Sequence, residues 1–354
     1  MNTGDFWRGR RVLVTGHTGF KGSWLCLWLQ SLGAELSGVA LPPDRDRALY
    51  TMAGVGDGMR SYHCDIRDAA ALARIVAEVE PECVLHLAAQ ALVRASYADP
   101  AGTYATNVMG TVHVLEAVRA TPSVRAVVVV SSDKCYENRE WLWGYRENDA
   151  MGGHDPYSSS KGCTELVCSA WAHSFFGAGS ATRLASARAG NVIGGGDWAR
   201  DRLLPDLVAA FASGEPVRLR YPQAVRPWQH VLEPLGGYLV LARHLLEGAG
   251  VHGEGWNFGP AETDARPVAE VVERAARLWG EGAGWQLEPV AQPAEAGLLR
   301  LDCTRARTRL GWAPRLSLET ALAWTIEWYR SWLAGGDVAA LTRAQIRQYE
   351  ELAR

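Results

Sequence analysis

The chain is built from short apolar runs that alternate with longer amphipathic stretches. Five apolar runs closed by glycine, small or polar residues predict β-strands, at residues 11–14, 35–41, 83–89, 126–131 and 181–187. Amphipathic stretches predict helices, at residues 23–32, 157–176, 232–247, 268–278 and 318–333, with a further strand and turn at 256–260. Strands that alternate with helices are typical of a parallel sheet covered on both faces. The pattern therefore predicts an α/β fold with a doubly wound parallel sheet.

A glycine-rich turn joins the first predicted strand to the first predicted helix. Gly16, Gly19 and Gly22 follow a GxxGxxG spacing in a strand, turn and helix context. Glycines there let the backbone approach a pyrophosphate, and the free amides at the helix N-terminus favour anions. We therefore expect a Rossmann-type dinucleotide site; a packing loop without a nucleotide is the alternative.

The end of the second predicted strand leaves the choice of dinucleotide open. The acidic residue that would bind the adenosine ribose of NAD is missing after Ala40. Arg45 and Arg47 follow closely and could accept the 2′-phosphate of NADP. Further along, Asp65 could accept a hydrogen bond from the adenine while Ile66 packs on its ring. A plain turn at Asp65, with Asp68 capping the next helix, is the alternative for that segment.

The predicted strand at 83–89 runs past Leu87 into the small residues Ala88 and Ala89, which let a flat ligand lie close. Asn107, a poor helix former inside a predicted helix, suggests a buried hydrogen-bonding task. His86 is read as a satisfied core histidine.

The candidate chemistry lies between Ser131 and Lys161. The run 127–130 delivers Ser132, Asp133 and Lys134 to the carboxyl edge of the sheet, where doubly wound folds bind ligands. Tyr157 stands four residues before Lys161, so both side chains share one helix face. We expect the lysine to lower the pKa of the phenol and make it a base for a sugar hydroxyl.

Lysine is rare in this chain, whereas arginine fills nearly every other basic position. The three lysines are Lys21, Lys134 and Lys161. Arginine cannot be neutralised, so a retained lysine suggests a site that needs a compact or deprotonatable amine; survival by chance is the alternative. Cations also occur close to aromatic residues at Arg218, Arg220 and residues 226–230. This composition fits the binding of a second diphosphate and a flat base. For each arginine alone, the alternative is a solvated surface residue.

Length, charge and cysteine usage narrow the class of protein. The 354 residues suggest two domains, or one large α/β domain with a smaller appendage. The formal net charge of −3 points to neither nucleic acid nor an anionic membrane. No apolar run is long enough to span a bilayer, and the N-terminus is expected to lead straight into a strand without a signal peptide. Seven scattered cysteines favour reduced thiols over disulfides or a zinc site. We expect a cytoplasmic protein without a metal, in which Cys135 is the accessible thiol.

The composition of the sequence changes at Arg188, where a glycine-rich loop begins. We predict a dinucleotide-binding domain and a smaller mixed α/β C-terminal substrate domain. The first comprises residues 1–187, with 226–260 packing back on it, and the second comprises residues 188–225 and 261–354.

These motifs resemble the extended short-chain dehydrogenase/reductase family of nucleotide-sugar enzymes, and within it the 4,6-dehydratases that act on CDP-glucose. The resemblance covers nearly the whole chain and is carried by residues 14–24, 131–138, 143–147, 152–161, 188–198 and 226–230. Tyr157 and Lys161 identify only the superfamily. Asp133 followed by Lys134 is more specific, because the related dTDP-glucose dehydratases typically place Asp-Glu there.

The resemblance implies a role for each matched residue. Tyr157 would be the base at the sugar O4, Ser132 would hydrogen-bond there and Lys161 would hold the nicotinamide ribose of NAD. Asp133 would be the acid at the departing C6 hydroxyl, and Lys134 would take the C5 proton. Cofactor contacts are expected at Gly16, Thr18, Gly19, Phe20, Lys21, Gly22, Asp65, Ile66, Leu87, Ala88, Ala89, Asn107, Tyr157 and Lys161. Substrate contacts are expected at Gln90, Asn191, Asp197, Arg202, Leu203, Arg226 and Arg300.

The implied reaction is the NAD-dependent dehydration of CDP-glucose to CDP-4-keto-6-deoxyglucose. The alternatives are a dTDP- or GDP-linked 4,6-dehydratase, a nucleotide-sugar 4-epimerase, and a Rossmann-fold regulator that senses dinucleotide without catalysis. The residues themselves do not distinguish cytidine from other bases. The family also implies a homodimer or tetramer, paired through helices near residues 106–117 and 157–176.

Overall fold

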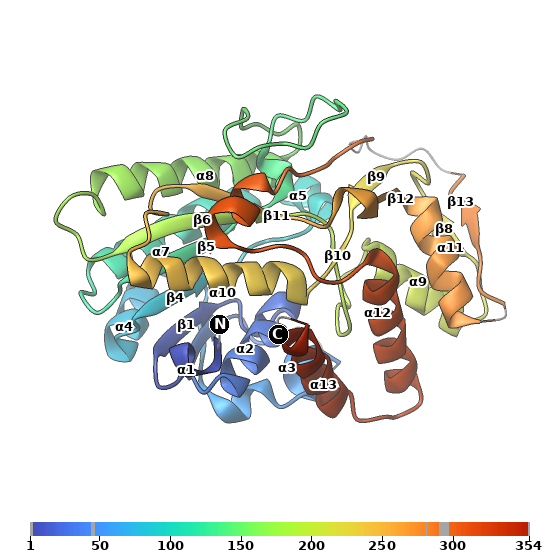
Figure 1. Cartoon of the computed structure of the whole chain (residues 1–354), viewed down its shortest axis with the longest axis horizontal. Coiled ribbons are helices and arrows are strands. Elements are labelled where there is room, and N and C mark those ends of the chain that lie inside the picture. The colour runs from blue at the N-terminus through green and yellow to red at the C-terminus, as the bar shows by residue number, and fades with distance from the viewer. Residues whose placement is uncertain (1–2, 44–46, 281, 290–296, 353–354) are drawn as a thin grey trace.

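The structure, a computed structural model, describes residues 3–43, 47–280, 282–289 and 297–352. Its centre is a seven-stranded sheet in the order β3-β2-β1-β4-β5-β6-β11, and every neighbouring pair in it is parallel (Figure 1). The strands are β1 (Arg11–Thr15), β2 (Glu35–Ala40), β3 (Arg60–His63), β4 (Cys83–His86), β5 (Ala126–Val130), β6 (Arg183–Ala189) and β11 (Gly255–Phe258). The strand order reverses between β1 and β4. The predicted doubly wound α/β fold is confirmed.

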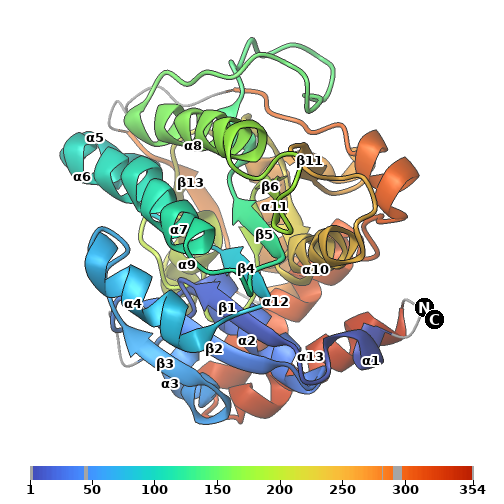
Figure 2. The ribbon, with the colours of Figure 1, turned by 90° about the vertical axis from the view of Figure 1, so that its left-hand side faces the viewer.

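Helices cover both faces of this sheet because successive strand residues point to opposite sides (Figure 2). Val127 and Val129 of β5 pack with one set of helices, and Val128 packs with the other. The first set is α4 (Ala69–Val79), α7 (Gly110–Arg119) and α8 (Pro156–Ser174). The second is α2 (Phe20–Ser31) and α10 (Leu232–Glu247). The nearly continuous apolar strands follow from burial on both faces.

Shorter segments connect these layers. Those before β5 are α1 (Thr3–Trp7), α3 (Leu49–Met52), η1 (Val55–Gly58), α5 (Val93–Ala98), α6 (Pro100–Tyr104) and the π-helical turn η2 (Ala105–Met109). The later ones are η3 (Asp133–Cys135), η4 (Glu262–Asp264) and η5 (Ala306–Leu310). Because α1 precedes β1, the expectation that the N-terminus leads straight into a strand was wrong.

A smaller group of elements lies beside the carboxyl ends of the central strands, on the right of Figure 1. It holds the pairs β8 (Val217–Leu219) with β13 (Trp285–Leu287) and β9 (Val225–Pro227) with β12 (Ala265–Pro267). Its helices are α9 (Leu203–Ala212), α11 (Val268–Trp279) and α12 (Leu318–Leu333). A short parallel pair, β7 (Val192–Ile193) with β10 (Gln229–His230), joins it to the sheet. The last helix, α13 (Val338–Glu351), packs back against α2.

The chain crosses between the two parts more than once. After β6 it enters the smaller group, returns as α10 and β11 to the large sheet, and leaves again toward α11 and α12. One continuous apolar core includes residues of both parts, such as Trp256 of β11 and Trp328 of α12. The predicted domain boundaries at 187, 225 and 260 stay a prediction.

Candidate active site

A cavity of about 970 Å³ lies between the large sheet and the smaller group of elements. Its walls come from the carboxyl ends of β1, β4, β5 and β6, the start of α2 and α8, and the segments around α9 and β8. Ligands of doubly wound sheets bind at this edge, next to the point where the strand order reverses. The cavity is therefore the candidate active site.

The glycine loop forms one end of the cavity because only glycine fits its close approaches. Gly16 has φ +76°, and a Cβ there would stand 2.8 Å from the backbone nitrogen of Ala88. A Cβ at Gly22 would overlap the carbonyl oxygen of Gly16. Gly19 precedes α2 and offers no side-chain cap to the first turn. The N–H groups of that turn are thus available to an anion.

The predicted adenosine end of the cavity is partly occupied by contacts within the protein. The Asp65 carboxylate accepts hydrogen bonds from the backbone and side chain of Arg67, which hold the pKa of Asp65 low. Asp68 caps α4 through the Ala71 amide. Arg47 stacks on Trp198, with its guanidinium 4.7 Å from the ring centroid, and does not line the cavity. Arg45 lies outside the described residues.

The short turn η3 after β5 places an acid and an amine together. The Asp133 carboxylate accepts from Ser132 Oγ at 2.9 Å and from Lys134 Nζ at 3.4 Å, both through Oδ1. Its other oxygen, Oδ2, is buried and has no partner within the described residues. Ser132 and Lys134 line the cavity, whereas Asp133 is fully buried behind them. A buried carboxylate oxygen without a partner is costly, which marks it as a candidate for a proton or a substrate hydroxyl.

Helix α8 packs against this turn and brings Tyr157 and Lys161 beside it. Asp155 caps its first turn, and Lys161 Nζ donates to the carbonyl of Val130 at 3.2 Å. Burial raises the pKa of Tyr157 to about 12, against the opposing effects of the Ser132 hydrogen bond and the Arg202 charge. The expected lowering of this pKa by Lys161 was therefore wrong for the protein without ligands. Burial also lowers the pKa of Lys161 itself to about 8.

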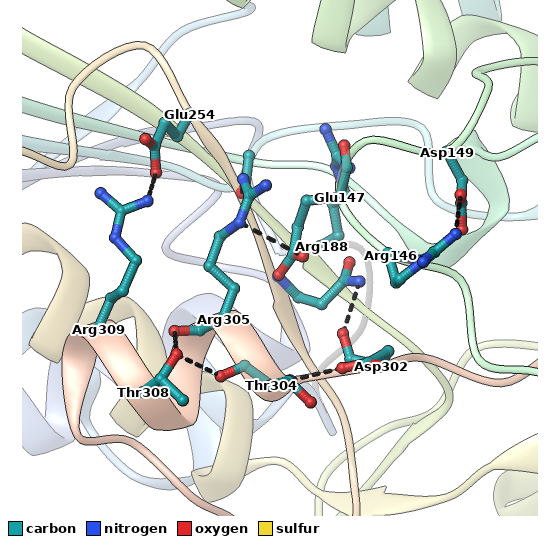
Figure 3. Close-up of polar contacts among 12 residues, drawn as sticks. Arg146, Glu147, Asp149, Arg188, Glu254, Asp302, Thr304, Arg305, Thr308 and Arg309 are labelled. Carbon is teal, nitrogen blue, oxygen red and sulfur yellow. Dashed lines mark hydrogen bonds and ion pairs between the residues drawn. The ribbon is translucent and has the colours of Figure 1, made fainter.

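A buried ion pair between α8 and β6 fixes the segments that carry the candidate residues. Arg188 Nη2 contacts Glu165 at 2.7 Å, and Arg188 Nη1 donates to Tyr136 Oη at 2.7 Å and to the carbonyl of Glu147 at 3.0 Å. Glu147 is in turn contacted by Arg305 Nε at 3.6 Å (Figure 3). These contacts tie the loop between η3 and α8 to the sheet and to η5.

The smaller part contributes polar groups that face the catalytic wall. Arg202 pairs with Asp197 at 3.0 Å, and both line the cavity. Asn191 Oδ1 is buried without a partner within the described residues, so a ligand donor would satisfy it. Leu203 and Arg226 line the same wall.

Four predicted residues do not reach the cavity wall. One is Asp133, which lies behind Ser132. The amide of Asn107 contacts the backbone of Gln90 and the Ser160 hydroxyl, so its buried hydrogen-bonding task is confirmed. The Gln90 side chain bonds Leu92 and Thr103 instead of facing the cavity. Arg300 pairs with Glu262 at 3.8 Å.

Two further predictions about buried groups are settled by the structure. His86 is a satisfied core histidine, bonded to Thr15 at 2.6 Å and Thr111 at 3.1 Å. Cys135 was expected to be accessible, and this was wrong: its side chain is fully buried, because η3 turns it away from the cavity.

The prediction missed a charged cluster at the cavity mouth. Asp201 bridges Arg94 of α5, at 3.0 Å, and Arg220 next to β8, at 3.2 Å. Both arginines line the cavity, as does Tyr97. Arg220 was noted as one of several cations in the sequence. Arg94 follows the end of β4, at the sheet edge where the other site residues were predicted. Its position after this strand could have identified it.

Comparisons with known proteins agree with this geometry. The sequence model of the family described as GDP-mannose 4,6 dehydratase matches residues 13–325. A CDP-glucose 4,6-dehydratase of Salmonella typhimurium is 50% identical over 98% of this chain and 97% of its own length. The dTDP-glucose 4,6-dehydratase 1 of Escherichia coli is 27% identical over 91% of this chain and 93% of its own.

Solved structures share the fold. A dTDP-glucose 4,6-dehydratase of Streptomyces venezuelae, crystallised with NAD, has a TM-score of 0.79 at 24% identity and covers 93% of this chain and 99% of its own. A UDP-glucose 4-epimerase of Thermotoga maritima has a TM-score of 0.78 at 24% identity and covers 91% and 99%. The family match over most of the chain, together with the relative at 50% identity, decides the membership. The chain belongs to the family of nucleotide-sugar 4,6-dehydratases that the matching sequence model describes.

Proposed function

We propose that this protein converts CDP-glucose to CDP-4-keto-6-deoxyglucose with NAD as its cofactor. The observation that carries the proposal is the Asp133–Lys134 pair at 3.4 Å after the end of β5, whose lysine lines one cavity with Tyr157. An epimerase needs the tyrosine but no acid and amine for C5 and C6. The CDP specificity rests on the 50% identity to the Salmonella enzyme.

The residues present fit a dinucleotide. The close approach of Gly16 to Ala88 leaves no room for a side chain, and the uncapped start of α2 offers free amides to a diphosphate. Gly16, Gly19, Phe20 and the strand ends at Leu87 and Ala88 would hold the cofactor. When bound, NAD supplies a hydride acceptor and a positive charge at the nicotinamide.

Tyr157 and Ser132 would act at the sugar O4. As the C4 hydrogen leaves as hydride, the O4 proton passes to Tyr157, which must therefore be ionised at that moment. A nearby positive charge lowers the pKa of a phenol. Bound NAD thus offsets the burial that raises the pKa of Tyr157 to about 12 in the free protein.

Lys134 and Asp133 would act at C5 and C6. The C4 ketone makes the C5 hydrogen acidic, so an amine can remove it. In the structure the two side chains form an ion pair through Asp133 Oδ1. Transfer of one proton from Lys134 to Asp133 yields the neutral amine and the carboxylic acid that the step requires. The acid would then protonate the departing C6 hydroxyl, so that water leaves. Once C6 has received the hydride that NAD holds, the Lys134 ammonium would return a proton to C5.

The direct test is incubation with NAD and each of the four nucleoside diphosphate glucoses. A 4-keto-6-deoxy product from CDP-glucose, detected by its ultraviolet absorbance in alkali and by NMR, supports the proposal. In deuterated water the product should carry deuterium at C5. Formation of CDP-galactose would instead establish a 4-epimerase, and no reaction with any of the four sugars would overturn the proposal.

We further propose a homodimer or tetramer that acts in the cytoplasm. Tyr104, Met109, Leu166 and Phe175 expose apolar surface on the elements where the family resemblance places subunit pairing. Light scattering after gel filtration tests this, and a monomer contradicts it. The free cysteines support a reducing compartment, and cell fractionation tests that. Within the described residues, no helix is both long enough and apolar enough to cross a membrane.

A further inference from the structure

Tyr136 directly follows η3, the turn that carries Asp133 and Lys134. Its ring is buried, and its hydroxyl lies between two other buried side chains. Tyr136 Oη accepts a hydrogen bond from Arg188 Nη1 at 2.7 Å and donates one to Asn257 Oδ1 at 2.7 Å. Burial raises the pKa of Tyr136 well above its usual value, so the hydroxyl stays protonated and can donate.

Both partners of the Tyr136 hydroxyl lie on the last two strands at this edge of the large sheet. Arg188 on β6 is the register partner of Asn257 on β11. The Asn257 amide nitrogen donates to two backbone carbonyls, at 2.8 and 3.0 Å, so its oxygen is the atom that faces the phenol. Gly255 leaves room for this arrangement, because a Cβ there would overlap the Arg188 guanidinium. The hydroxyl therefore ties the end of η3 to the sheet.

Helix α8, which carries Tyr157 and Lys161, has anchors that do not involve this hydroxyl. The Tyr157 backbone N–H donates to Ser96 Oγ at 3.1 Å. One helical turn beyond Lys161 on the sequence, Glu165 accepts from Arg188 Nη2 at 2.7 Å, an interaction that uses a different nitrogen from the one facing the phenol. Loss of the hydroxyl thus leaves the anchors of α8 in place.

The turn η3 is only three residues long, and its other backbone contacts are made to loops. The Cys135 carbonyl accepts from the Gly152 N–H at 2.8 Å, and the Lys134 N–H donates to Ser132 Oγ at 3.2 Å. Gly152 and Ser132 both lie outside helices and strands. The position of the Lys134 amine therefore depends on the side chain that joins this turn to the sheet.

We propose that Tyr136 is a positioning residue for the loss of water and not for the hydride transfer. This inference rests on the proposed function, which assigns the oxidation at C4 to Tyr157 on α8 and the elimination to Asp133 and Lys134 on η3. Without the hydroxyl, η3 shifts while α8 keeps its place, so the amine loses its alignment with C5. A misplacement of about 1 Å can cost about 10²-fold in rate.

The experiment compares wild type with Tyr136→Phe, which removes the hydroxyl and keeps the ring. In a single turnover with NAD and CDP-glucose, the absorbance of the reduced nicotinamide measures hydride transfer. Exchange of the C5 hydrogen in deuterated water measures the elimination. Tyr136→Phe should reduce NAD at a rate close to wild type, accumulate NADH together with the 4-keto sugar, and exchange C5 about 10²-fold more slowly.

Tyr349→Phe is the matched control for the loss of a buried hydroxyl. Tyr349 is fully buried on α13, and its hydroxyl donates to Glu233 at 2.7 Å. It does not line the cavity. Both steps should stay close to wild type in this variant, which separates a general loss of stability from a misplaced turn.

Arg188→Lys tests the same contact from the donor side. A lysine keeps a charge for Glu165 but lacks the fork that reaches Tyr136 at the same time. This variant should slow C5 exchange more than hydride transfer, and it decides alone if Tyr136→Phe does not fold, as judged by circular dichroism. Equal slowing of both steps, or of neither, in the deciding variant would overturn the inference. Wild-type protein that leaves CDP-glucose unchanged would overturn the proposed function itself.

Discussion

At the scale of single residues, the site combines groups whose burial opposes their chemical task. In the proposed reaction Tyr157 must lose a proton, yet burial raises its pKa to about 12. Asp133 must hold a proton, yet its Oδ1 accepts from Lys134 and Ser132. In the proposed reaction the charge of bound NAD offsets the first mismatch, and proton transfer from Lys134 to Asp133 removes the second.

Replacement of Lys134 tests the amine. Lys134→Met should leave CDP-glucose binding intact and lower turnover by about 10²- to 10⁴-fold, the usual contribution of a general base. The measurement is the exchange of the C5 hydrogen in deuterated water during turnover. The control is Arg146→Met, which removes the exposed ion pair with Asp149 in the loop after η3. It should change neither the turnover nor the C5 exchange. Normal C5 exchange in Lys134→Met would remove Lys134 from the mechanism.

The tyrosine can be examined by titration. With NAD⁺ bound, the phenolate absorbance that is present in wild type and absent in Tyr157→Phe should appear at least about one pH unit lower than in the free protein. The sign follows from the positive nicotinamide, which stabilises the phenolate. NADH lacks that charge and serves as the control. An equal shift with both cofactor forms would mean that the ring charge does not reach Tyr157.

At the scale of elements, the carboxyl ends of the parallel strands bring together side chains that are far apart in the sequence. The turn after β1, the residues after β4 and η3 after β5 all reach one cavity. The start of α8 faces them because Arg188 and Glu165 fix its position relative to β6. The arrangement depends on tight packing at the glycine loop, where backbone stands against backbone.

A methyl group at Gly22 tests that packing. Its Cβ would overlap the Gly16 carbonyl, so Gly22→Ala should lower the free energy of unfolding by about 1–3 kcal/mol and weaken binding of both dinucleotides. Gly284→Ala is the matched control, because a Cβ there meets nothing within 4 Å. Urea denaturation and dinucleotide titration measure the two effects. Gly22→Ala with wild-type stability and binding would contradict the close approach.

At the scale of the whole molecule, the fold buries several histidines in neutral form. Burial lowers the pKa of His86 to about 3, and of His230 to about 3. The unfolded chain binds these protons at about pH 6.5 and below, whereas the folded chain does not. Stability therefore falls as the pH is lowered from about 6.5 toward 3.

One histidine can be isolated from the other titrating groups by substitution. Between about pH 6 and pH 4, wild type should lose about 1.4 kcal/mol of stability per pH unit more than His86→Gln, the effect of one proton. Urea unfolding at several pH values measures both slopes. Parallel slopes would show that His86 is protonated in the folded protein.

The fold and much of the site could be predicted because their signals are local. A glycine turn, a strand end or a tyrosine four residues before a lysine is visible in a few residues. The directions of Gln90 and Arg300 could not be predicted, because Thr103 and Glu262 bind them only after folding. Likewise, α13 was missed because its buried face includes Thr342, which bonds the indole of Trp328, so no apolar stripe marks it.

The late return of the chain as β11 limits how this protein can be shortened. Residues 1–187 contain the nucleotide motifs but lack β11, the strand that covers the outer edge of β6. A fragment cut there would present the backbone of an apolar strand to any neighbouring molecule, and such edges aggregate. Recombinant dissection or a premature stop codon in this stretch would therefore yield insoluble material, and an engineer who wants the dinucleotide half must graft residues 232–258 back onto it.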